Sequence, residues 1–111
     1  MLMIGDIVGP DATAYLAGRL PGLRRAHDVD LVVANAENCA VTAPTPWRGF
    51  GMTAELVEQL LESGADVVTS GNHGWDGPEA GVVHGYPKVL RPHNFPEEVL
   101  GKGIVTLEIR D

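Results

Sequence analysis

Short apolar runs alternate with longer segments of helical periodicity along the chain. Residues 1–8, 30–34, 66–70 and 88–90 are predicted strands, because each is a brief apolar run that ends at turn-forming or charged residues. Residues 104–109 predict one more strand, because every second side chain is apolar, at Val105, Leu107 and Ile109.

The segments between the strands predict helices. Residues 11–27 carry apolar side chains at helical spacing, with a kink or a second short helix expected at Pro21. The next helix should begin after Thr53 as N-cap and end at Gly64. Residues 76–79 resemble the start of a short helix, with proline near its first position and an acidic residue at each end.

This order of elements predicts an α/β fold with a mostly parallel sheet. The length of 111 residues fits one domain, residues 1–111, and we find no repeat or linker. In parallel sheets, functional residues collect in the loops beyond the carboxyl ends of the strands.

Composition and charge narrow the function classes. Lys and Arg number 8 against 15 Asp and Glu, a net charge of -7, which disfavours bulk nucleic-acid binding. A small phosphate substrate remains compatible with this charge if a metal supplies local positive charge. No apolar run reaches the ~18 residues that a membrane span needs, so no membrane association is expected.

The single cysteine and the N-terminal sequence suggest a cytoplasmic protein. Cys39 cannot form an internal disulfide, and residues 1–6 lack the basic start of a signal peptide. We interpret Cys39 as a small buried side chain rather than a thiolate ligand or nucleophile, because no basic neighbour can be assigned to it.

Polar residues with metal-binding chemistry follow the first three predicted strands. Asp6 follows the first, Glu37 and Asn38 the second, and Asn72 and His73 the third. Taken singly, each could be a turn residue, a cap or an ion-pair partner. Their occurrence at three consecutive strand ends instead predicts one shared cation site.

The donor types indicate which chemistry such a site could perform. Carboxylate, amide and imidazole groups suit Mn²⁺, Fe or Zn²⁺ in mixed nitrogen and oxygen coordination. A glutamate can bridge two ions, and two ions ~3.5–4 Å apart can clamp a phosphate and activate a water for in-line attack. A nearby imidazole could protonate the leaving oxygen.

Five motifs occur in an order that resembles the calcineurin-like metallophosphoesterase superfamily. The finer resemblance is to its small bacterial branch of cyclic-nucleotide phosphodiesterase-like proteins. The motifs are Gly5-Asp6-Ile7-Val8-Gly9, Asn35-Ala36-Glu37-Asn38, Gly49-Phe50-Gly51-Met52-Thr53, Gly71-Asn72-His73-Gly74-Trp75-Asp76 and Arg91-Pro92-His93-Asn94-Phe95-Pro96. They cover almost the whole chain, which would then form the parallel-sheet half of an α/β/β/α sandwich.

The resemblance implies metal-dependent phosphodiester hydrolysis with two divalent ions, Mn or Fe or else Zn. The implied metal ligands are Asp6, Glu37, Asn38 and Asn72, with Glu37 bridging or approaching both ions. His73 would be the general acid rather than a ligand. Arg91 and Asn94 would face the phosphate of a small phosphodiester or cyclic-nucleotide substrate, although their motif is also a plain turn.

The sequence departs from the family pattern in two ways. Residues 39–48 are longer than the usual glycine-rich link and contain Pro44, Pro46 and Trp47, so this loop is either a lid or a tolerated insertion. Family members are more than twice as long, and their second half supplies further histidine ligands. The remaining histidines here, at 27, 84 and 93, do not match those positions.

Three functions therefore stay open. The first is a phosphodiesterase whose site is completed by a C-terminal segment or by self-association into a homo-oligomer. The second is a catalytically incomplete piece with an assembly or structural role. The third is a nucleotide-binding α/β module that works without metal.

Overall fold

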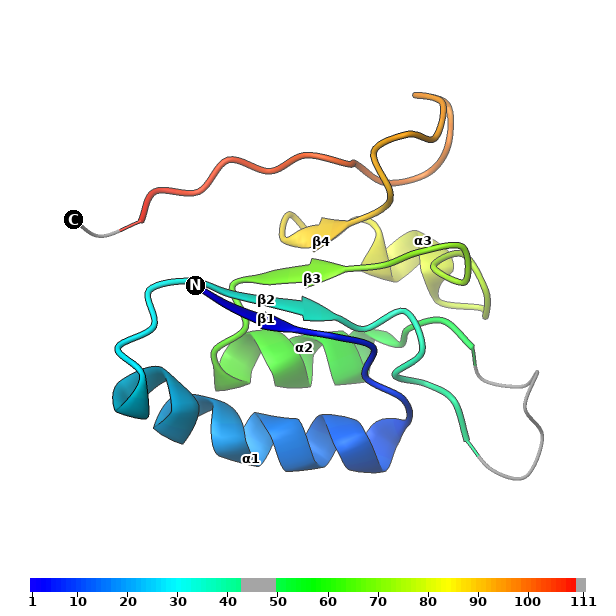
Figure 1. Ribbon diagram of the computed structural model, residues 1–111. Helices are drawn as coiled ribbons and strands as arrows, with labels where there is room; N and C mark the ends of the chain where they lie inside the picture. The colour runs from blue at the N-terminus through cyan, green and yellow to red at the C-terminus, as the bar shows by residue number, and fades with distance from the viewer. Residues whose placement is uncertain (43–49, 110–111) are drawn as a thin grey trace.

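The computed structural model describes residues 1–42 and 50–109, and its centre is a parallel sheet (Figure 1). The strands are β1 (Leu2–Ile4), β2 (Val32–Asn35), β3 (Val67–Thr69) and β4 (Val89–Leu90). The helices of the described residues are α1 (Pro10–Ala26), α2 (Ala54–Ser63) and α3 (Ala80–Val83). Neighbouring strands pair in the order β1-β2-β3-β4, all parallel. The predicted α/β class with a parallel sheet is confirmed.

Helices α1 and α2 lie side by side against one face of the sheet (Figure 1). Right-handed crossovers between consecutive strands of this order place their helices on the same face. Alternate strand residues point toward these helices, and those from β2, β3 and β4 are fully buried. They are Val32, Ala34, Val68 and Val89.

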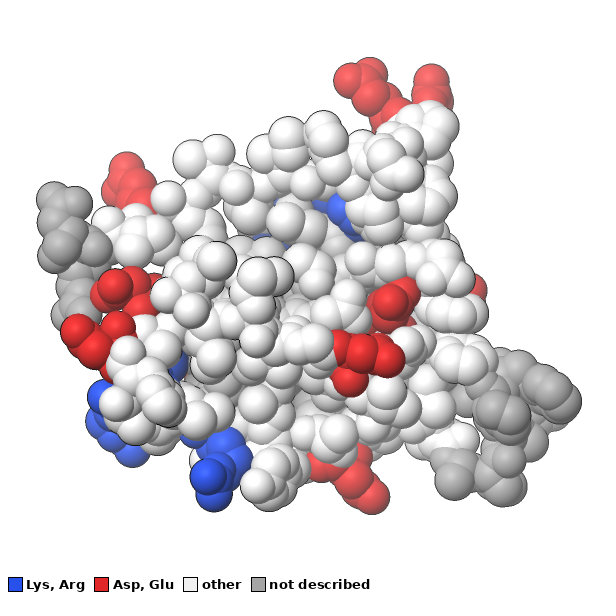
Figure 2. Space-filling model, viewed as in Figure 1, with Lys and Arg blue, Asp and Glu red and all other residues white. Residues whose placement is uncertain are grey.

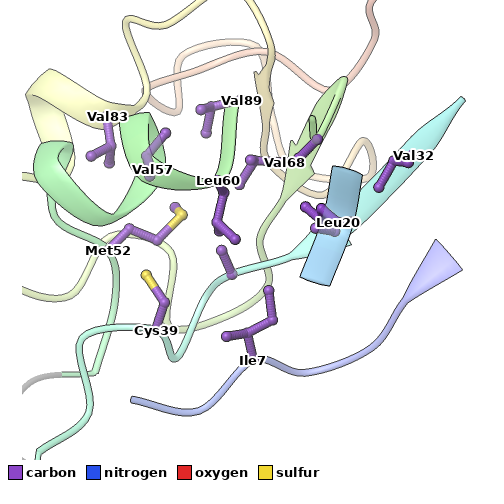
Figure 3. Close-up of a cluster of buried hydrophobic side chains, with 13 residues drawn as sticks. Ile7, Leu20, Val32, Cys39, Met52, Val57, Leu60, Val68, Val83 and Val89 are labelled. Carbon is purple, nitrogen blue, oxygen red and sulfur yellow. The ribbon is translucent and has the colours of Figure 1, made fainter. Parts of the chain in front are cut away.

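The core lies between the sheet and the two long helices (Figure 3). Leu20 of α1 and Val57 and Leu60 of α2 are fully buried against the sheet residues. Each such side chain contributes about 1.5–3 kcal/mol on leaving water, so this layer holds the strand ends in place.

Helix α1 runs without interruption through Pro21, so the predicted second short helix is wrong. A proline inside a helix costs about 3 kcal/mol because it removes a hydrogen bond and crowds the preceding turn. Leu20, directly before it, is fully buried, and its packing keeps the segment helical. The helix begins after Gly9, whose φ of 91° suits glycine, with Pro10 in the first turn.

The boundaries of α2 are as predicted. The hydroxyl of Thr53 accepts a hydrogen bond from the backbone N–H of Leu56 at 3.3 Å. Gly64 ends the helix with a φ of 124°. The amphipathic stripe between them supplies much of the core.

The helix expected from residue 76 instead begins at Ala80. The two acidic groups that suggested an earlier start have other partners. Asp76 interacts with His73, and Glu79 accepts a hydrogen bond from the backbone N–H of Ala54 at 3.2 Å, at the start of α2. The side chains therefore connect two different elements rather than cap their own helix.

The strand predicted at residues 104–109 is absent from the structure, although its residues are described. Lys102 forms one isolated parallel bridge with Leu90, after which the chain runs extended on the side of the sheet away from α1 and α2 (Figure 1). The alternation of this segment does correspond to partial burial, since Val105 and Leu107 are less exposed than Ile104. A strand also needs a neighbouring backbone to pair with, and none in the described residues pairs with this segment.

No helix among the described residues is both long and apolar enough to cross a membrane.

Candidate functional site

Backbone hydrogen bonds continue between neighbouring strands beyond their formal ends. Ile7 N–H donates to Asn35 O at 3.1 Å, and Ala36 N–H donates to Thr69 O at 3.0 Å. These bonds keep the segments after β1, β2 and β3 together at one edge of the sheet. The residues predicted from the strand ends lie on these segments.

Asp6 and Asn38 are in direct contact at this edge. The Asn38 amide Nδ2 donates to Asp6 Oδ1 at 2.8 Å. The other atom of that amide, Asn38 Oδ1, is buried and has no hydrogen-bond partner among the described residues. Burying an amide oxygen without a hydrogen bond costs free energy. A ligand that donated a hydrogen bond to Asn38 Oδ1, or coordinated it, would remove this cost, and the exposed carboxylate of Asp6 contacts the same side chain.

Glu37 contacts the segment after β3. Its Oε2 accepts a hydrogen bond from the backbone N–H of His73 at 3.3 Å. A Cβ atom on Gly71 would lie 2.8 Å from the carboxylate carbon of Glu37 and closer still to one oxygen. Glycine at position 71 therefore allows the backbone to approach the carboxylate.

His73 is held on two sides by residues that the sequence analysis did not select. Its Nδ1 lies 2.8 Å from Asp76 Oδ2, and the Phe50 ring stacks on the imidazole with centroids 4.5 Å apart. The pairing of Nδ1 leaves Nε2 as the ring nitrogen that can exchange a proton with a ligand. The sequence did hint at this contact, because Asp76 stands three residues after His73 in a turn flanked by Gly71 and Gly77.

Gly51 brings the segment before α2 against the same turn. Its φ is 96°, and a Cβ atom there would lie 3.0 Å from the carbonyl carbon of Asp76 and 3.3 Å from the carbonyl oxygen of His73. The Gly-x-Gly motif thus supplies a close backbone contact to the His73 turn.

Trp75 anchors the far side of this turn. Its ring stacks on His84 at 5.6 Å and meets Phe95 edge-on at 4.7 Å. Its Nε1–H donates to Leu100 O at 3.1 Å. The turn is therefore tied to the segment after β4.

The remaining predicted residues are placed differently. Asn72 lies between Gly71 and His73 with an exposed side chain. Arg91 is buried, and its guanidinium donates to the carbonyl oxygens of four residues. These are Gly101, Pro92, Phe95 and Pro96.

Arg91 therefore has a structural role in shaping the turn that follows β4. The phosphate contact predicted for it and for the exposed Asn94 stays a prediction. Trp47 and most of the 39–48 loop predicted as a lid or an insertion lie outside the described residues.

The predicted metal ligands at this edge can be judged by their donor types and contacts. Within residues 1–42 and 50–109, no three His, Cys, Asp or Glu side chains lie close enough to hold an ion by themselves. The carboxylates of Asp6 and Glu37, with the vacant amide oxygen of Asn38, are oxygen donors of the type that hard and borderline divalent ions accept. In donor type these groups fit such an ion, and among them Asp6 and Asn38 are in direct contact.

Acidic side chains are visible near the carboxyl ends of the strands (Figure 2). Basic groups in the same view lie along the half of α1 that ends with Arg24 and Arg25, and a smaller basic area is visible above the strands. On this face, a phosphate would therefore meet negative charge at the strand ends unless a cation were bound there.

Cys39 lies in the core beside Met52 and takes no part in the site (Figure 3). Burial raises the pKa of its thiol from 9.0 to about 11. The thiol is therefore protonated at neutral pH, in agreement with its interpretation as a buried side chain.

We expect Cys39 to react slowly with Ellman's reagent in the native state. A pKa shift from 9.0 to about 11 lowers the thiolate fraction at pH 8 about 100-fold. The absorbance of the released thiolate measures the reaction, and urea should accelerate it by exposing the sulfur. Because this is the only cysteine in the sequence, the signal has one source. Equally fast labelling with and without urea would contradict its burial.

Comparison with known proteins places these motifs in a family context. The model of the YmdB-like protein family matches residues 2–111. A curated relative, the 2′,3′-cyclic-nucleotide 2′-phosphodiesterase of Bacillus subtilis, is 36% identical over 105 residues. That alignment covers 94% of this chain and 37% of the relative, so the chain spans little more than a third of the relative's length.

Two crystal structures share the fold. A hypothetical protein from Thermus thermophilus superposes with a TM-score of 0.80 at 36% identity, over 96% of this chain and 38% of its own. A phosphatase from Mycoplasma pneumoniae superposes with a TM-score of 0.80 at 29% identity, over 97% of this chain and 38% of its own.

Proposed function

The chain belongs to the YmdB-like protein family, and from this premise we propose that it supplies metal ligands and a proton donor for phosphodiester hydrolysis. The resemblance inferred from the five motifs is thereby confirmed at the level of the family. The similar phosphodiesterase and phosphatase support hydrolysis of a small phosphodiester, of which a cyclic nucleotide is the candidate substrate.

One observation carries the proposal. The buried Asn38 amide oxygen without a partner lies beside Asp6, while the adjacent Glu37 contacts the His73 backbone. Asp6, Glu37 and Asn38 would hold divalent ions of the Mn or Fe type, with Asn72 as a further ligand or a phosphate contact. When bound, such ions lower the pKa of a coordinated water and neutralise phosphate charge.

The residues of this chain have separate tasks in the proposed reaction. Asp76 fixes the orientation of His73 through Nδ1, which leaves Nε2 to donate a proton to the leaving oxygen. Phe50 limits rotation of the imidazole by stacking on it.

Metal binding and hydrolysis test the proposal together. We expect the purified chain to bind Mn²⁺ in equilibrium dialysis and to hydrolyse 2′,3′-cyclic AMP only with Mn²⁺ or Fe²⁺ present. Excess EDTA should abolish turnover, and its removal with fresh metal should restore it. Turnover that EDTA leaves unchanged would reject the proposal, and nucleotide affinity in metal-free buffer without turnover would favour a metal-free binding module.

The incomplete donor set favours a second candidate function. The described residues contain no three clustered His, Cys, Asp or Glu side chains, and in this case another polypeptide supplies the further ligands. The chain would then be an assembly piece of a larger hydrolase. Turnover that appears only after addition of the relatives' remaining segment would identify this case.

A further inference from the structure

A cavity of about 520 Å³ lies next to the His73 turn and has no role in the reaction proposed above. Phe50 and Asp76, both in contact with His73, form part of its wall. A ligand in the cavity would therefore lie beside the proposed proton donor. Its position suits the part of a substrate that does not react.

The walls of the cavity combine a flat apolar surface with hydrogen-bond acceptors. Phe50, Met52 and Pro78 provide the apolar part. The carboxylates of Asp76 and Glu79 provide the acceptors. An aromatic ring with N–H groups on its edge complements both features, because stacking uses the apolar wall and the carboxylates accept from the edge.

The same carboxylates exclude the phosphate from the cavity. Two negative side chains in one wall would repel it, and no Lys or Arg is among the described residues that line the cavity. The phosphate of a nucleotide would have to lie outside, and the base inside.

Glu79 is the acceptor best placed to distinguish one base from another. Its Oε1 accepts from the backbone N–H of Ala54 at 3.2 Å, which fixes the carboxylate at the start of α2. Asp76 is already paired with His73 through Oδ2. The Glu79 carboxylate keeps Oε2 and the second lone pair of Oε1, so it can still accept two neighbouring N–H groups side by side. Guanine presents such a pair on its Watson–Crick edge, whereas adenine presents one donor beside an acceptor.

We propose that this cavity binds the nucleobase of the substrate and that Glu79 selects guanine over adenine. The proposal rests on the proposed phosphodiesterase function and specifies its substrate class. It makes Glu79 a specificity residue and Phe50 a stacking surface shared by the base site and His73.

Binding of mononucleotides tests the base site without hydrolysis. We expect the chain to bind guanosine 5′-monophosphate about tenfold more tightly than adenosine 5′-monophosphate in calorimetry. Amide NMR shifts on titration should concentrate at residues 50–53 and 76–79. The inosine nucleotide, which lacks one of the two donors, should bind with intermediate affinity.

Two matched variants isolate the carboxylate. Glu79→Gln retains an acceptor for the Ala54 N–H but replaces one oxygen with a donor, so the guanine preference should disappear or shift toward adenine. Glu98→Gln changes an exposed acid away from the cavity lining and should leave the preference unchanged. Equal affinities for the two nucleotides, an unchanged preference in Glu79→Gln, or no binding of either nucleotide would overturn the proposal.

The nucleotide-binding experiments can fail or succeed independently of whether the chain hydrolyses phosphodiesters. EDTA-sensitive hydrolysis with no base preference would reject the base site and leave the phosphodiesterase function standing. A Glu79-dependent guanine preference without metal-dependent hydrolysis would reject the phosphodiesterase function and leave the base site standing.

Discussion

Replacing Gly71 with alanine is expected to lower the Mn²⁺ affinity of the chain about 100-fold, with a corresponding loss of any metal-dependent hydrolysis. The new Cβ would lie 2.8 Å from the carboxylate carbon of Glu37, which would have to move away from the strand-end site. Gly71 does not have a positive φ, so alanine adds no backbone strain at this position. The fold should therefore persist while the proposed ligand is displaced.

Calorimetry or electron paramagnetic resonance measures the affinity, and circular dichroism checks the fold. Gly5→Ala is the matched control, because Gly5 precedes Asp6 in the same site and a Cβ there meets no atom within 4 Å. We expect this variant to bind Mn²⁺ like the parent chain. If Gly71→Ala also retained the parent affinity, the role of Glu37 as a ligand would be wrong.

Replacing Gly51 with alanine is expected to cost about 3 kcal/mol of unfolding free energy, from positive-φ strain and overpacking together. Gly51 has a φ of 96°, and a Cβ atom would lie 3.0 Å from the carbonyl carbon of Asp76. The obstacle is backbone rather than a flexible side chain, so the two segments would have to separate.

Urea unfolding followed by circular dichroism gives the free energy directly. Gly77→Ala separates strain from collision, because Gly77 has a φ of 84° but a Cβ there would meet its nearest atom, Phe50 O, at 3.6 Å. This variant should lose only about 1 kcal/mol, the cost of the positive φ. A Gly51 variant as stable as the Gly77 variant would show that the His73 turn relaxes at little cost.

The hydrophobic pattern predicts the central layer of the fold because local and tertiary preferences agree there. The apolar runs of β2 and β3 face the core, and α2 begins at Thr53 and ends at Gly64 as its capping residues indicate. At Pro21 and at residues 104–109 the decisive factor is not local. Packing of Leu20 overrides the proline, and the lack of a pairing strand among the described residues overrides the alternation.

The sequence also predicts which strand ends come together, because parallel strands place their carboxyl ends at one edge. Contacts of Asp6 with Asn38 and of Glu37 with the His73 backbone agree with that rule. The strand-end rule does not predict that Asp76 pairs with His73 or that Glu79 accepts a hydrogen bond from Ala54. Such contacts depend on turn conformation and on side-chain direction, which residue spacing alone does not specify.

The unbroken strand order has a consequence for how the chain can assemble. Each strand pairs with the strand that precedes it in the sequence, so no strand waits for a later segment to fill a gap. During synthesis, the sheet can therefore grow by adding one strand and its helix at a time to a single advancing edge, as the polypeptide leaves the ribosome.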